Sequence, residues 1–164
     1  EENLVEHVPR IGMLVRGIRK KDAHEIYDIR KALDTLATIK AMEIMTADDF
    51  LELEALLNYG ETLNAEDKVE EVLQNFSDFN AFIYEKSEML RLREIVTELR
   101  TYLVYFRDVA IRSSARRSIA LEEHWLILKG MKNNDISLIT MMVHDHLDRS
   151  LAFILAEMER RSLD

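Results

Sequence analysis

The sequence predicts an all-α protein, an antiparallel bundle of about six or seven helices. Its 164 residues include only one proline and four glycines, the two residue types that most disfavour a helix interior. From about residue 23 onwards, apolar residues recur at spacings of three and four, which is the period of an amphipathic helix. The chain is 48% hydrophobic and long enough to bury a sizeable core, so we expect one globular helical domain.

The first 22 residues differ from the rest of the sequence. Residues 4–15 alternate around Pro9 and Gly12, a pattern that predicts a short hairpin followed by a linker. We therefore divide the chain into an N-terminal segment, residues 1–22, and a helical domain, residues 23–164.

Three helices are predicted in the first half of the helical domain. They span about residues 23–45, 47–63 and 65–86, and Thr46 and Asp49 form a capping box that begins the second. The apolar positions expected to face the core are Ile26, Leu33, Leu36 and Ala37 on the first helix, Phe50, Leu51, Leu53, Leu56 and Leu57 on the second, and Val69, Val72, Leu73, Phe76, Ile83 and Tyr84 on the third.

Three further helices complete the predicted bundle. A long helix rich in leucine and tyrosine covers about residues 88–112, and the other two cover about 115–132 and 136–161. The pair of asparagines before Asp135 favours a helix stop, and Asp135 itself is a good N-cap for the last helix.

Charge and composition exclude several classes of protein. The net charge of −9 argues against nucleic-acid binding by this domain, because phosphate contacts need clustered cations. The sequence has no cysteine, so disulfides and thiolate metal sites are excluded. It also has no signal peptide and no apolar run long enough to span a membrane, and we expect a cytoplasmic protein.

Three polar side chains stand at core-facing positions of three different predicted helices. Asn80, His124 and His146 share the helical phase of the apolar residues around them, whereas His144 is about 200° away from His146 and should face solvent. Burying an unpaired polar group costs on the order of 1–3 kcal/mol, so we expect the three side chains to converge on one polar pocket. Alternatively, each is a core residue that bonds to its neighbours or to the backbone.

Arg30 is expected on the inward side of the first helix. A buried guanidinium needs an anion and can bind a carboxylate through two parallel hydrogen bonds. The anion is either Asp34 or another carboxylate of the chain, or the carboxylate of a bound ligand, and we favour the ligand. Arg30 therefore joins the three pocket residues in the predicted ligand-binding set, which also includes Tyr84 on the same helix stripe as Asn80.

The sequence gives little support for an enzyme. Di-iron helical bundles need Glu-x-x-His on two helices, but Leu121 and Val143 stand three residues before the two pocket histidines. No His-Glu-x-x-His zinc motif, glycine-rich phosphate loop or nucleophile elbow occurs. We predict that the domain is not an enzyme. The alternatives are a metal-dependent enzyme on a helical bundle and a ligand-free structural or dimerising domain.

Several short motifs follow one another along nearly the whole chain. They are residues 4–15, Arg30-Lys31-Ala32-Leu33-Asp34, Phe79-Asn80, Glu123-His124, and Asp135 followed eleven residues later by His146-Leu147. In this order and spacing they resemble the effector-binding FCD domain of GntR-type transcription regulators of the FadR subfamily. The first motif resembles the end of that family's winged helix-turn-helix, Asp34 stands in place of a glutamate, and Asn80 stands in place of a histidine.

The resemblance implies a ligand-sensing and dimerisation domain of a bacterial transcription regulator. A small metabolite, with a carboxylate favoured, would bind in the pocket and control a DNA-binding helix-turn-helix domain absent from these 164 residues. The resemblance further implies that the protein contacts DNA only through that domain, that it works as a homodimer, and that it has no membrane partner.

Many members of this family bind a divalent metal such as zinc or nickel through Asp-x-x-x-His on one helix and two further histidines. The first two ligand positions correspond here to Phe76 and Asn80, whereas His124 and His146 match the other two. The resemblance therefore implies at most a weak metal site formed by His124 and His146, with Asn80 as a possible third ligand.

Overall fold

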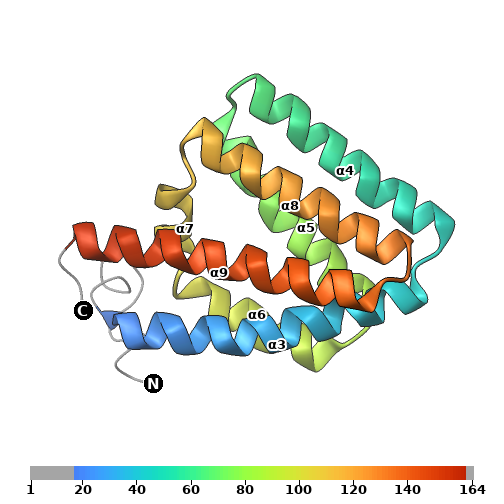
Figure 1. Cartoon of the computed structure of the whole chain (residues 1–164), viewed down its shortest axis with the longest axis horizontal. Coiled ribbons are helices and arrows are strands. Elements are labelled where there is room, and N and C mark those ends of the chain that lie inside the picture. The colour runs from blue at the N-terminus through green and yellow to red at the C-terminus, as the bar shows by residue number, and fades with distance from the viewer. Residues whose placement is uncertain (1–16, 162–164) are drawn as a thin grey trace.

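The computed structural model describes residues 17–161, and this part of the chain contains seven α-helices and no strand (Figure 1). The helices are α3 (Lys20–Ile44), α4 (Ala47–Ala65), α5 (Val69–Lys86), α6 (Leu90–Thr101), α7 (Val104–Ala110), α8 (Ser114–Lys132) and α9 (Ile136–Arg160). The all-α class is therefore confirmed. None of these helices is long and apolar enough to cross a membrane. The predicted hairpin, within residues 4–15, lies outside the described residues.

The first and last of these helices form one side of the bundle. Helices α3 and α9 lie side by side and run in opposite directions (Figure 1). Helix α8 packs between α9 and α4, α5 packs against α3 and α4, and the short α7 packs against α9. The core between them includes Phe79, Phe106, Leu128, Ile139 and Ile154, each at most 2% exposed.

Capping residues determine two of the helix ends as the sequence predicts. The side chain of Thr46 accepts a hydrogen bond from the backbone N–H of Asp49 at 3.2 Å, and the carboxylate of Asp49 accepts one from the backbone N–H of Thr46 at 2.9 Å. The side chain of Asp135 accepts a hydrogen bond from the backbone of the first turn of α9 at 3.0 Å. The predicted capping box and N-cap are both confirmed.

Two helices begin three or more residues away from their predicted starts. Helix α3 begins three residues earlier, at Lys20, because the carboxylate of Asp22 accepts a hydrogen bond from the backbone N–H of Arg19. Helix α5 begins four residues later than predicted, at Val69, because Asp67 has a φ of 56°, a left-handed conformation that a continuing helix does not allow.

The prediction of one long helix over residues 88–112 is wrong. The chain forms α6 and α7 there, separated by a tight turn at Tyr102 and Leu103. The backbone N–H groups of these two residues donate to the carbonyls of Leu99 and Arg100, three residues back instead of four. Both side chains of the turn are buried. Since a straight helix buries only one face, the break lets consecutive apolar residues enter the core.

Two positions expected in the core lie on the surface. Leu36 is 39% exposed and Leu51 is 62% exposed. Helix α4, which carries Leu51, lies at the edge of the bundle and has neighbours on one side only (Figure 1). A helix with neighbours on one side only buries fewer of its apolar side chains than the spacing of those residues in the sequence predicts.

Candidate ligand-binding site

The three polar side chains expected to converge lie together. The ring centroids of His124 on α8 and His146 on α9 are 4.9 Å apart, and Asn80 on α5 lines the same cavity. His124 is only 1% exposed, whereas Asn80 and His146 are partly buried. The convergence predicted from helical phase is confirmed, while the binding of a ligand by these residues stays a prediction.

The cavity is small and its lining is rich in arginine. It has a volume of about 40 Å³, and five helices contribute to its wall, namely α3, α5, α7, α8 and α9. A water needs roughly 10–15 Å³ of such a volume, so the cavity has room for about three waters or for a group the size of a carboxylate. Its charged lining consists of four arginines, Arg30, Arg107, Arg116 and Arg149, and one carboxylate, Glu123.

Two aromatic rings of α5 hold His124 in place. Phe79 stacks on the imidazole with centroids 4.1 Å apart, and Phe76 meets it edge-on at 5.3 Å. The Nδ1 atom of His124 is buried and has no hydrogen-bond partner among residues 17–161. Burial lowers the pKa of His124 well below its usual value, and the nearby His146 and Arg107 lower it further. The imidazole is therefore neutral at physiological pH.

We expect this neutral imidazole to make the domain less stable in acid. Below about pH 6.5 the unfolded chain binds a proton at His124 but the folded domain does not, so this contribution to stability is present above that pH and lost below it. The loss should approach about 1.4 kcal/mol per pH unit until the pKa of the folded state is reached. Urea unfolding of the wild type and of His124→Phe, repeated at several pH values below neutrality, measures the difference in slope.

The matched control for this experiment is His24, an exposed histidine on α3. The variant His24→Asn should keep the pH dependence of the wild type, whereas His124→Phe should have a shallower one. Identical slopes in all three proteins would show that His124 takes up a proton in the folded state.

Glu123 holds the second histidine of the cavity. Its carboxylate lies 2.7 Å from Nδ1 of His146 and accepts a hydrogen bond from Nε of Arg149 at 2.6 Å. Burial opposes the ionisation of Glu123, but the hydrogen bonds and charges of His146 and Arg149 outweigh it and keep the pKa of Glu123 below its usual value. An ionised Glu123 fixes the orientation of the His146 ring through its contact with Nδ1. The other ring nitrogen, Nε2, takes no part in this contact.

Arg30 has a partner within its own helix. Its Nη2 donates to one carboxylate oxygen of Asp34 at 2.9 Å, and the hydroxyl of Tyr84 donates to the other oxygen at 2.6 Å. All three side chains are buried. Burial lowers the pKa of Arg30, but Asp34, together with Tyr84 and Tyr27, outweighs this and raises it. Burial and Asp34 both raise the pKa of Tyr84, so its hydroxyl stays protonated and can donate.

Our preference for a ligand carboxylate as the partner of Arg30 is corrected by this network, because Asp34 supplies the anion. The Nε atom of Arg30 is buried without a partner in the described part of the chain, and the side chain still lines the cavity. Tyr84 lies away from the cavity, in a smaller neighbouring one that Asp34, Asn80 and His146 also line. A role for Arg30 and Tyr84 in ligand binding stays a prediction.

Sequence reasoning assigned no role to Glu123 or to three of the arginines. Arg116 belongs to a short basic run, which is usually a solvated helix end. One signal was available: Arg149 follows His146 by three residues and so shares its helix face. His144, expected to face solvent, is partly buried because α9 is surrounded by α3, α7 and α8, but it does not line the cavity.

The donor set of the cavity does not fit a resident metal ion. Of the four ligand positions implied by the resemblance, Phe76 has no donor atom and instead packs against His124. Among residues 17–161, no group of three or more His, Cys, Asp or Glu side chains is placed to hold a metal. Stable sites have three or four protein ligands. Weak binding by His124 and His146, with Asn80 as a third ligand, stays a prediction.

Comparison with known proteins agrees with this architecture. The family described as the FCD domain matches residues 25–149. Among solved structures, E. coli McbR/YncC aligns with a TM-score of 0.75 and 22% sequence identity, over 81% of this chain and 67% of that chain. At this identity the likeness establishes the fold alone. No match was found among curated proteins.

Proposed function

Because the chain belongs to the FCD domain family, we propose that it is the effector-binding domain of a bacterial GntR-type transcription regulator and that its effector is a small carboxylic acid. FCD domains are regulatory domains, so the family also bears out the prediction that the domain is not an enzyme. The division into an N-terminal segment, residues 1–22, and a sensing domain, residues 23–164, is part of this proposal.

The charge of the cavity lining supports an acidic effector. Four arginines line the cavity and Glu123 is the one carboxylate among its lining residues, although the chain as a whole carries a net charge of −9. Guanidinium groups bind carboxylates through paired, charge-assisted hydrogen bonds. The neutral His124, with its unpartnered Nδ1, adds a hydrogen-bonding group that a ligand could use. This clustering of cations inside an acidic domain is the observation that carries the proposal.

Regulation requires that the ligand favour one arrangement of the protein over another. Five helices line the cavity, so a bound acid would contact most of the bundle at once. We propose that occupancy changes how these helices pack and thereby positions a helix-turn-helix domain outside this chain, through which alone the regulator contacts DNA. Action as a homodimer in the cytoplasm belongs to the same proposal.

A thermal-shift titration of the purified chain with small carboxylic acids tests this function. At least one acid should raise the melting temperature, since a ligand at a hundred times its Kd adds about 2.7 kcal/mol to the stability of the folded state. The uncharged amide of the same acid is the matched control and should have no effect. If no acid stabilises the domain, or if amides stabilise it equally, the cavity is not an acid site and a ligand-free structural domain becomes the better description.

A further inference from the structure

Three of the four arginines that line the cavity are already neutralised by carboxylates of the chain. The ion pairs are Arg30 with Asp34 at 2.9 Å, Arg107 with Asp108 at 2.6 Å, and Arg149 with Glu123 at 2.6 Å. In each pair the guanidinium donates to an ionised oxygen at hydrogen-bond distance. These three arginines bring no net charge to the cavity.

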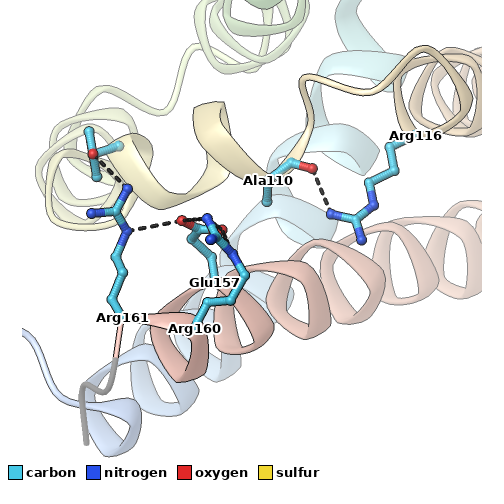
Figure 2. Close-up of polar contacts among 6 residues, drawn as sticks. Ala110, Arg116, Glu157, Arg160 and Arg161 are labelled. Carbon is cyan, nitrogen blue, oxygen red and sulfur yellow. Dashed lines mark hydrogen bonds and ion pairs between the residues drawn. The ribbon is translucent and has the colours of Figure 1, made fainter.

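Arg116, in the first turn of α8, is the fourth arginine. Its Nη1 donates to the backbone carbonyl of Ala110, the last residue of α7, at 2.8 Å (Figure 2). Its guanidinium also lies over the ring of Phe153, 4.2 Å from the centroid. Both partners are uncharged, and within residues 17–161 no carboxylate pairs with Arg116. Arg116 therefore leaves one positive charge in the lining.

The same view contains two arginines that, unlike Arg116, have a carboxylate partner. Near the end of α9, Glu157 accepts hydrogen bonds from Arg160 at 2.7 Å and from Arg161 at 2.9 Å (Figure 2). Arg100 does not change the charge of the cavity lining, because it lies in a separate crevice with Arg30 and Arg107. The uncompensated charge of the lining is thus located at Arg116.

We propose that Arg116 anchors the single carboxylate of the effector and that the domain consequently selects small monocarboxylates over dicarboxylates. This inference rests on the proposed acid-binding function of the cavity. One carboxylate balances the charge of Arg116, and the guanidinium exchanges a neutral carbonyl for a stronger charge-assisted pair. A second carboxylate would enter the same small cavity with no unpaired arginine left among the described lining residues to balance its charge, which is unfavourable.

The rest of the lining suits the apolar body of such an acid. Phe76, Ile119, Leu147 and Phe153 form apolar wall around the charged groups. Arg116 is partly exposed and Arg149 has a side chain 47% exposed, so solvent reaches the cavity beside these two arginines. A short alkyl chain could therefore lie against the apolar wall while its carboxylate meets Arg116.

The test compares the short monocarboxylates acetate and propionate with the dicarboxylates of the same chain length, oxalate and malonate, by isothermal titration calorimetry on the full chain. The monocarboxylate of each pair that binds should bind more tightly. In Arg116→Gln its affinity should fall roughly 10- to 100-fold, the usual cost of losing hydrogen bonds to a charged group. Arg116→Lys should recover part of the affinity, because an ammonium group keeps the electrostatic attraction but cannot make the two parallel hydrogen bonds of a guanidinium.

The matched control is Arg112→Gln, which removes an exposed arginine four residues away that pairs with Glu70 outside the cavity. Its affinity for the monocarboxylate should equal that of the wild type. Circular dichroism and the melting temperature without ligand check that each variant folds. If acids bind but Arg116→Gln binds them equally well, or if dicarboxylates bind as tightly as monocarboxylates, this inference is wrong while the proposed function stands. If the wild type binds neither series, both are wrong.

Discussion

Replacing Asp34 with alanine is expected to lower the free energy of unfolding by about 3–5 kcal/mol, the cost of leaving a buried charge without its partner. The carboxylate of Asp34 accepts hydrogen bonds from Arg30 at 2.9 Å and from Tyr84 at 2.6 Å. Without it, a buried guanidinium loses its anion and a buried hydroxyl loses its acceptor. Because domains are typically stable by only about 5–15 kcal/mol, this loss should move unfolding of the variant to a clearly lower urea concentration than that of the wild type.

Urea unfolding followed by circular dichroism measures this effect. The matched control is Asp28→Ala on the same helix, whose side chain is 74% exposed and lies 3.7 Å from Lys31, and which should change stability by at most about 1 kcal/mol. The double variant Asp34→Ala with Arg30→Met should regain part of the loss, because it removes the orphaned charge as well. Equal stability of Asp34→Ala and Asp28→Ala would contradict the assignment of Asp34 as the anion that Arg30 requires.

Replacing Phe79 with alanine is the second change with a large expected effect, a loss of about 3–5 kcal/mol. Phe79 is 1% exposed and stacks on His124 with centroids 4.1 Å apart. The variant leaves a void in the core and uncovers one face of the imidazole. With less burial, the pKa of His124 should rise towards its usual value.

Urea unfolding measures the stability of this variant, and NMR titration of the histidine ring signals measures the pKa. Phe82→Ala is the control, since Phe82 is three residues further along α5 and only partly buried, and its smaller loss should leave the His124 titration unchanged. A Phe79→Ala protein that loses stability without any shift of the His124 titration would show that the stack does not control the protonation of that ring.

The parts of the site that follow from helical phase could be predicted from the sequence. Asn80, His124 and His146 are polar residues on apolar stripes, and three helices that share a core must bring such positions together. Helix starts could likewise be predicted where a local capping pattern determines them, as at Thr46 and Asp135.

The parts that depend on tertiary packing could not be predicted. No proline or glycine marks the helix break at Tyr102 and Leu103. The break depends on the burial of these two side chains in the core of the folded domain. The partner of Arg30 was ambiguous, because spacing allows both an internal carboxylate and a ligand. The position of Arg116 in the cavity lining depends on how α7 and α8 are placed relative to each other, which a local pattern does not encode.

The pairing of α3 with α9 has a consequence for synthesis of the protein on the ribosome. Helix α3 is complete at Ile44, but its partner is not complete until Arg160. At roughly 5–20 residues per second, the nascent chain carries α3 without that partner for about 6–25 seconds. During this interval the side of α3 that packs against α9 stays open to chaperones and proteases, while α5 and α6 can already cover other parts of the helix. The α3–α9 side of the domain thus forms only after α9 has been synthesised, and a nascent chain that stops before α9 leaves that side of α3 uncovered.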